Sequence, residues 1–505
     1  MYSTIVAWAT LRAKTLKYTI HTGDEGDEAP VKRLGGWDAT FIYSDTANVP
    51  THTMKIALVD TSTLGEKFTF DAFRRIVANR LPALDPLRYR LVHIPLKMHH
   101  PMWLEDCDVD IDYHLRRAVL PQPGGRRELD DLIGEIASTP LDHSRPLWEM
   151  YFVERVVDNR VAIVTKVHHA LADGVAVANL LAHAVDLTWN PEAAPTVCSA
   201  SPSSTELLRA AGRDHLTQLK RLPKVFGDTV SGVRRLRRRT RDQVKPQEPP
   251  GQQSPPRMFL NHVVDPGRRF ATATMSLAEV KLTGKHFGVT INDVVLAIAS
   301  GALRELLTRR DGQPDQPLIA SVAFNTDPSP ERISGNALGG LFVSLPVNVA
   351  DPMQRLRLVS MAARDAKEAN AALGPDLLGR WINYLPPPIA PGAYRWLANR
   401  DRNRLYNLSL SNVPGPRQPG HIGSAPISEF FSVGPLQPGC GMNVTVWSYV
   451  DQLNVAVLTD RQTLEDAHHA TDALLREFAE IWRAAGFAGE PTTVSTALAQ
   501  ASGVS

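Results

Sequence analysis

The most regular alternation of hydrophobic and polar positions in the chain lies at residues 160–167, RVAIVTKV. This alternation and its β-branched residues predict a strand that is buried on at least one face. Apolar residues then recur at helical spacing over residues 176–185. Residues 168–174 are therefore expected to form a polar turn between a strand and a helix.

Comparable patterns along the rest of the chain predict a mixed α/β protein. Alternating segments predict strands at residues 55–60, 87–94, 109–119, 149–156 and 341–347. Helical spacing of apolar residues predicts helices at residues 68–81, 128–138 and 291–307.

Composition and charge narrow the class of protein. A chain of 505 residues with 43% hydrophobic and 21% charged residues is typical of a globular protein with two or three domains. The net charge of +2 gives no reason to expect a nucleic-acid partner. The three cysteines form no CxxC pair, which favours a reducing compartment. No apolar run reaches the ~20 residues of a bilayer span and no signal peptide is recognisable, so a cytoplasmic location is expected.

The polar turn carries the candidate chemistry, His168, His169, Asp173 and Gly174. Successive side chains of a strand point to opposite faces, so the two histidines cannot both face one cavity if the strand continues through them. We expect one histidine to act as a general base, because its ordinary pKa lies near neutral pH, and the other to hold structure. Asp173 could fix the turn or pair with a cation, and Gly174 would allow a close approach of the backbone.

Two other interpretations of the turn stay open. Two histidines and an aspartate could bind a metal, but metal ligands usually share one face, so no metal is expected. The turn could also be a buried polar corner whose hydrogen bonds are all satisfied. Two further pairs, His99-His100 and His468-His469, lack the Asp-Gly at this spacing and are expected on the surface.

The HHxxxDG pattern of this turn resembles the signature of the CoA-dependent acyltransferase superfamily, which includes chloramphenicol acetyltransferase and condensation domains of peptide synthetases. Other motifs narrow the resemblance to the bacterial wax ester synthase/diacylglycerol acyltransferase family. They are Asp38 with Phe41, DIDYHLR at 110–116, PLDHSRPLWE at 140–149, INDVVLAIASGALRELL at 291–307, GN at 335–336, SNVPGP at 411–416 and GMNVTVWSY at 441–449. The resemblance covers residues 34–487 and implies two chloramphenicol-acetyltransferase-like α/β halves with an active-site channel at their interface.

The resemblance also implies a reaction. A long-chain acyl group would pass from acyl-CoA, a substrate, to diacylglycerol or a fatty alcohol, without any cofactor. His169 would take the hydroxyl proton, and His168 would face the scaffold. Asp173 would be structural, with Arg145 as its candidate partner.

Four residues of the second half complete the set of candidates. Asn292 and Asp293 would either cap a helix or support the active-site region. Asn443 and Thr445 are the candidates for an oxyanion donor or for the lining of the channel.

The chain is expected to divide into an N-terminal extension (1–30), a first half (31–190), a basic, Pro-rich linker with a helix (191–257), a second half (258–490) and a tail (491–505). The linker helix combines an arginine cluster with an apolar stripe. A solvated charged face and adsorption to an anionic membrane or lipid-droplet surface are both open interpretations.

Two departures from the family pattern bear on acceptor choice and on the level of activity. Val175-Ala176-Val177 stands where the family has a further small Ser or Gly, and AFNTD at 323–327 replaces a stretch with Pro, Ser and Arg. Two alternative functions remain, a condensation-type acyltransferase with another acceptor and a noncatalytic lipid-binding or lipid-droplet protein. The absence of a carrier domain from this sequence disfavours the first, and the intact His169 disfavours the second.

Overall fold

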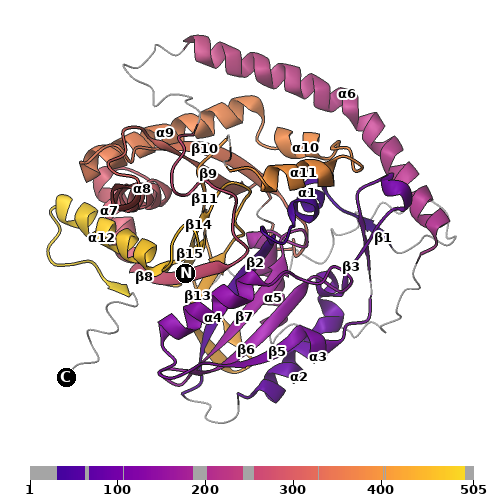
Figure 1. Ribbon diagram of the computed structural model, residues 1–505, viewed down its shortest axis with the longest axis horizontal. Helices are drawn as coiled ribbons and strands as arrows, with labels where there is room; N and C mark the ends of the chain where they lie inside the picture. Colours follow the sequence, from indigo (N-terminus) through magenta and orange to yellow (C-terminus); the bar gives the residue numbers. More distant parts are fainter. Residues whose placement is uncertain are drawn as a thin grey trace, which may run out of the picture.

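The computed structural model describes residues 31–62, 68–105, 107–185, 202–242, 255–327, 329–401, 403 and 405–494. They form two large β-sheets flanked by helices, and one long helix lies along the outside of both halves (Figure 1).

The first half contains, in chain order, β1 (Val31–Arg33), α1 (Gly36–Ser44), β2 (His52–Asp60), α2 (Phe70–Arg80), the short helices η2 (Leu81–Ala83) and η3 (Asp85–Arg88), β3 (Arg90–Val92), η4 (Pro95–Lys97), β4 (Met102–Leu104), α3 (Ile111–His114), β5 (Leu115–Val119), α4 (Arg126–Ser138), β6 (Trp148–Val156), β7 (Arg160–His168) and α5 (Gly174–Val185). The long helix α6 (Ser204–Asp242) follows, and the second half contains β8 (Arg268–Ser276), α7 (Leu277–Phe287), α8 (Ile291–Arg310), β9 (Leu318–Asn325), β10 (Leu338–Leu345), α9 (Pro352–Leu373), α10 (Leu377–Ile382), α11 (Ala390–Ala398), β11 (Leu408–Val413), β12 (His421–Ile422), β13 (Ala425–Val433), β14 (Met442–Tyr449), β15 (Gln452–Asp460), α12 (His468–Ala484) and β16 (Thr493–Val494).

The first sheet contains strands from both halves of the chain. Its order is β12-β13-β2-β7-β6-β5, so two strands of the second half form one side of it. β13 pairs antiparallel with β2, with Val433 opposite Met54. β2 also pairs antiparallel with β7, with His52 opposite His168. The first half of the chain therefore depends on the second for part of its own sheet.

The two faces of β7 pack against different helices, as the two-residue period of a strand requires. Ile163 lies in a core with side chains of α2 and α5. Ala162 and Val164 lie in another core with side chains of α4 and with Phe270 and Leu458 of the second sheet. α4 thus contacts both sheets and joins the two halves.

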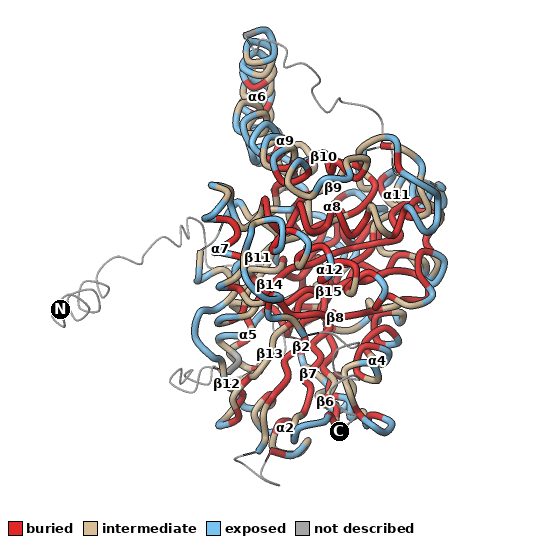
Figure 2. The backbone as a smooth tube through the Cα atoms, turned by 90° about the vertical axis from the view of Figure 1, so that its left-hand side faces the viewer, coloured by how far each residue is buried: buried red, intermediate tan, exposed pale blue. Residues whose placement is uncertain are grey.

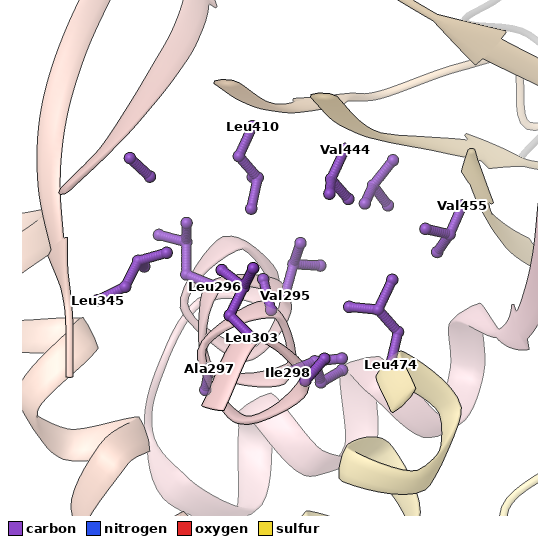
Figure 3. Close-up of a cluster of buried hydrophobic side chains, with 14 of the residues drawn as sticks. Val295, Leu296, Ala297, Ile298, Leu303, Leu345, Leu410, Val444, Val455 and Leu474 are labelled. Atoms are coloured by element: carbon purple, nitrogen blue, oxygen red, sulfur yellow. The ribbon is translucent and has the colours of Figure 1, made fainter. Parts of the chain in front are cut away.

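The second sheet has the order β10-β9-β11-β14-β15-β8-β16, and α8 packs on its face (Figure 3). The side chain of Thr290 accepts a hydrogen bond from the Asp293 N–H, and the Asp293 carboxylate accepts one from the Thr290 N–H. This capping box fixes the start of α8. Leu296 and Leu303 of α8 are buried beneath the sheet, and burying each leucine stabilises the fold by about 1.5–3 kcal/mol.

α6 is buried on one side and exposed on the other (Figure 2). Its inner side packs on α9 and α10, and a Cβ added at Gly232 would lie 2.2 Å from the Leu373 carbonyl oxygen. On its outer side Leu216, Leu219 and Phe226 are 62%, 64% and 62% exposed. In the part of the chain that the structure describes, no single helix is long and apolar enough to cross a bilayer, and α7 with α8 would pass only as a pair bent by 99°.

The predicted elements at residues 55–60, 68–81, 128–138, 149–156, 160–167 and 291–307 coincide with β2, α2, α4, β6, β7 and α8. Two strands were predicted too long. Residues 87–94 hold only the three-residue β3, because η3 occupies their beginning. The strand predicted at residues 109–119 is limited to β5, because residues 111–114 form a helical turn in which the Asp110 side chain accepts the Tyr113 N–H. The expected surface position of the other histidine pairs is wrong for His99, His100 and His468, which are buried.

Candidate active site

The two histidines at the end of β7 lie in different surroundings. His168 is fully buried, and its Nδ1 accepts the Ala170 N–H at 3.1 Å. Its Nε2 therefore carries the proton and lies 3.1 Å from Asp45 Oδ2 and 3.1 Å from Thr51 Oγ1. Burial lowers the pKa of His168, and Asp45 opposes this shift. Both ring nitrogens of His168 thus form hydrogen bonds within the protein.

His169 is partly exposed and is oriented by Asn336 of the second half. Asn336 Nδ2 donates to the His169 carbonyl oxygen at 2.7 Å and to Asp38 Oδ1 at 2.8 Å, which fixes the two ends of the amide. Asn336 Oδ1 then lies 3.0 Å from His169 Nδ1 and can only accept, so Nδ1 carries the proton. Nε2 keeps its lone pair, which is the form that a general base requires.

α1 runs past both histidines. Phe41 stacks on the His169 ring at 4.0 Å between centroids, and Asp45 follows the helix and contacts His168. Asp38 on the same helix holds Asn336. A Cβ added at Gly36 would lie 2.6 Å from the Asn383 backbone nitrogen, so the start of α1 requires a residue without a side chain.

Asn336→Ala is expected to lower kcat by about 10²-fold, because the His169 ring would lose its orientation and its fixed tautomer. KM for acyl-CoA should change much less. Steady-state assays of the folded variant would measure both constants. A kcat close to wild type would show that Phe41 stacking alone places the ring.

Asp173 joins the turn to the second half. One of its oxygens accepts the N–H groups of Val175 and Ala176 at 3.0 Å each, which caps α5. The other accepts the Ala337 N–H at 2.9 Å. Arg332 Nη2 forms an ion pair with the carboxylate at 2.9 Å. Asp173 therefore has a structural role: it caps α5 and connects the turn to the second half.

The expected pairing of Asp173 with Arg145 is wrong. Arg145 lies 3.5 Å from Asp110 and 3.5 Å from Asp142, and its guanidinium stands over the Tyr113 ring. The actual partner, Arg332, also donates to the Gly335 carbonyl oxygen at 2.9 Å and so holds the residue before Asn336.

The expected close approach at Gly174 is also wrong. A Cβ added there would meet only Val413 Cγ2, at an ordinary contact distance of 3.9 Å. Gly174 is the first residue of α5, and its backbone conformation does not require glycine.

The other candidates from the second half lie in networks of their own. Asp293 caps α8 and accepts from Ser360 Oγ at 3.2 Å, and Asn292 is its neighbour on the same first turn. On β14, Asn443 Nδ2 donates to the Pro435 carbonyl oxygen at 3.0 Å. Thr445 Oγ1 donates to Asn443 Oδ1 at 2.9 Å. The donors of Asn443 and Thr445 are thus engaged within the protein, and their roles as oxyanion or channel residues stay predictions.

Asp45, His143 and His168 form a group whose donor atoms lie within 4.8 Å of one another. These residue types are zinc ligands in other proteins. Here Asp45 Oδ2 lies 2.8 Å from His143 Nε2 and 3.1 Å from His168 Nε2. A carboxylate that accepts from two imidazoles accounts for this geometry without an ion.

Two cavities lie between elements of the two halves, and neither is lined by His168 or His169. A cavity of about 660 Å³ lies beside Asp45 and His143, and its lining includes Lys97, Arg395 and Asn399. A narrower cavity of about 190 Å³ lies between the first sheet, α2, α5 and β14, and nearly all of its lining is apolar. The larger cavity thus carries two cations, Lys97 and Arg395, and the smaller one is nearly all apolar.

Burial lowers the pKa of His169 well below the ordinary value of 6.5. Asp173 opposes this shift, and Lys55 adds to it. The imidazole is therefore neutral at pH 7, as a base with a free Nε2 must be.

Two sheet-and-helix halves with a histidine pair at their junction form the two-halved, chloramphenicol-acetyltransferase-like fold. The same fold occurs in the first condensation domain of the calcium-dependent antibiotic synthetase, with 13% identity, a TM-score of 0.55, and coverage of 93% of this chain and 100% of that chain. It also occurs in a wax ester synthase/diacylglycerol acyltransferase from Marinobacter aquaeolei VT8, with 24% identity, a TM-score of 0.59, and coverage of 90% and 100%. The predicted fold class is confirmed.

The chain belongs to the wax ester synthase/diacylglycerol acyltransferase family. The model of the family's catalytic domain matches residues 34–295, and the model of its C-terminal domain matches residues 334–482. A Mycobacterium tuberculosis H37Rv protein that bears the name of a diacylglycerol O-acyltransferase is 51% identical over 472 residues, which are 93% of this chain and 100% of that protein. The family predicted from the motifs is confirmed.

Sequence reasoning did not find the roles of Arg332 and Asn336. Gly335-Asn336 was recognised only as a motif, and its signal was the Asn directly after a glycine, which has φ +74° here. Arg332, three residues earlier, carried no signal that distinguishes it from other arginines.

Proposed function

We propose that the protein transfers a long-chain acyl group from acyl-CoA to the hydroxyl group of a lipid alcohol, diacylglycerol or a fatty alcohol, with His169 as general base. The observation that carries the proposal is the contact of His169 Nδ1 with Asn336 Oδ1 at 3.0 Å. This contact leaves Nε2 unprotonated on a residue that is partly exposed.

The chemical step needs no cofactor. His169 Nε2 takes the proton of the acceptor hydroxyl as its oxygen attacks the thioester carbonyl. The C–O bond forms, the tetrahedral intermediate collapses, and the C–S bond breaks. The proton then passes from His169 to the CoA sulfur, which leaves as the thiol.

The cavities suggest where the two parts of acyl-CoA bind. The phosphates of CoA suit the larger cavity, because Lys97 and Arg395 line it and cations bind phosphate strongly. The acyl tail suits the apolar cavity on the His169 face of the sheet, because burying methylene groups is favourable.

Purified protein with palmitoyl-CoA and either hexadecanol or dioleoylglycerol tests this function. CoA thiol release that depends on the acceptor, with the ester identified by mass spectrometry, is the expected result. Tight binding of acyl-CoA with no ester from either lipid would instead favour a noncatalytic lipid-binding protein. Ester formation only with a non-lipid acceptor would favour the condensation-type alternative.

The same proposal includes adsorption to an anionic membrane or lipid-droplet surface through the outer side of α6. Leu216, Leu219 and Phe226 lie there at helical spacing, with the exposed cations Lys220 and Lys224 beside them. An exposed apolar stripe flanked by cations suits the interface of an anionic bilayer. Lipid acceptors would enter the protein from that surface.

Replacing Leu216, Leu219 and Phe226 together with glutamine is expected to weaken binding to phosphatidylglycerol vesicles at least about tenfold, because three apolar side chains lose their place in the bilayer. Vesicle flotation measures the bound fraction. Met361→Gln, at a 61% exposed position on α9, is the matched control and should bind as wild type does. Equal binding of the triple variant would remove α6 from the proposal.

A further inference from the structure

Lys55 is a buried lysine on the sheet face that also carries His169. It is 2% exposed and stands on β2 opposite Thr165 of β7. Among the residues that the structure describes, no carboxylate forms an ion pair with it. A buried ammonium without a counter-charge is costly, so Lys55 does not contribute stability in the way that a paired lysine does.

The amine of Lys55 leans toward the end of the sheet where His169 lies. Its Nζ contacts Thr53 Oγ1 at 3.5 Å and donates to Ser432 Oγ. Thr53 is the next residue of β2 on this face, and the carbonyl oxygen of Thr51, just before β2, accepts the His169 N–H at 2.8 Å. The charge of Lys55 is close enough to act on the pKa of His169.

Lys55 also lines the apolar cavity of about 190 Å³. Its Nζ lies 5.1 Å from the centroid of the Trp447 ring, which lines the same cavity. An ammonium has three donors, and the described side chains supply two hydrogen-bond acceptors. One donor therefore remains for a ligand in the cavity.

We propose that Lys55 is a further catalytic residue, whose amine donates a hydrogen bond to the carbonyl oxygen of the acyl thioester when the acyl tail occupies this cavity. The inference rests on the proposed acyl transfer. As the alcohol oxygen adds to the carbonyl carbon, negative charge develops on the carbonyl oxygen, and the hydrogen bond strengthens. Lys55 keeps its proton throughout, while the hydroxyl proton passes through His169 to the CoA sulfur.

The charge of Lys55 gives the proposal a signature in the pH profile. Burial lowers the pKa of Lys55 to about 7, and Asp173 opposes the shift. The ammonium is therefore lost as the pH rises through about 7, and kcat/KM should fall on that side. Arg80 and Tyr449 are the other ionisable groups that line the cavity.

Lys55→Met removes the amine and keeps most of the side-chain volume. We expect kcat to fall by about 10²–10³-fold, as for the loss of one oxyanion donor, with a smaller change in KM. The alkaline fall of kcat/KM should disappear, and the acid fall should move to higher pH because a positive charge near His169 is gone. The thermal midpoint should not decrease, since no ion pair is broken.

Lys166→Met is the matched control. Lys166 is also buried in this sheet, but it lies 3.5 Å from Glu149 and donates to the Thr139 carbonyl oxygen on the opposite face. The control should lose some stability, because the buried Glu149 loses one of its two cation partners and keeps only Arg116, at 3.0 Å, and it should keep most of kcat.

A readout without turnover separates this inference from the proposed function. In a His169→Ala background, the ¹³C resonance of bound [1-¹³C]palmitoyl-CoA should lie downfield of its position in water, and adding Lys55→Met should remove that shift. An active wild type whose Lys55→Met variant keeps its kcat, its pH profile and this resonance would overturn the role of Lys55 alone. A wild type that binds acyl-CoA but acylates no acceptor would overturn both proposals.

Discussion

A His169→Ala variant is expected to transfer palmitoyl groups with a kcat about 10²–10⁴-fold below wild type, because the acceptor hydroxyl loses its general base. KM for palmitoyl-CoA should stay near the wild-type value, since the proposed cavities do not depend on the imidazole. Acceptor-dependent thiol release measures both constants. His421→Ala, at an exposed position on β12, is the control and should behave as wild type does.

The pH dependence of the wild type follows from the same residue. A base is active when it is unprotonated, and burial lowers the pKa of His169 below 6.5. The acid fall of kcat/KM is therefore expected below pH 6.5, on the opposite side of the profile from the fall that Lys55 causes as the pH rises through about 7. An acid fall with its midpoint at or above pH 6.5 would contradict the neutral imidazole.

Arg332→Met is expected to lower the free energy of unfolding by about 3–5 kcal/mol, because Asp173 is fully buried and would lose its only ion-pair partner among the described residues. Activity should fall as well, since Arg332 also holds the Gly335 carbonyl oxygen beside Asn336. Urea unfolding followed by fluorescence gives the stability.

Arg145→Met is the control for this prediction. Its ion pairs with Asp110 and Asp142 are largely exposed, so it should change stability by only about 0–1 kcal/mol. If the two variants were equally stable, Asp173 would not depend on its arginine. The contrast also distinguishes the arginine suggested by the motif from the one that the fold supplies.

The part of the site that could be predicted from sequence is the part made by neighbours in the chain. The alternation along residues 160–167 predicted that the two histidines face opposite sides of the sheet. The helical spacing of apolar residues after Gly174 predicted the helix α5. Distant contacts have no such local signal. Asp173 meets Arg332, 159 residues away, only because the second half folds back onto the turn.

Lys55 shows another limit of sequence reasoning. A lysine in an alternating strand is usually exposed, and the segment 55–60 gave no reason to expect otherwise. β2 is an inner strand because β13 and β7 pair with its two edges, and its faces are buried against α2 and α5 on one side and against α4 and the second sheet on the other. The sequence near Lys55 does not predict that the strand of residues 425–433 pairs with this one.

The place of β13 in the first sheet has a consequence for synthesis of the chain on the ribosome. Residues 52–168 leave the exit tunnel long before residue 433, so the growing chain must hold an unfinished sheet with an open edge at β2. Such edges invite pairing with other chains. Chaperones that shield nascent strands should therefore raise the yield of this protein, and truncations before residue 433 should aggregate.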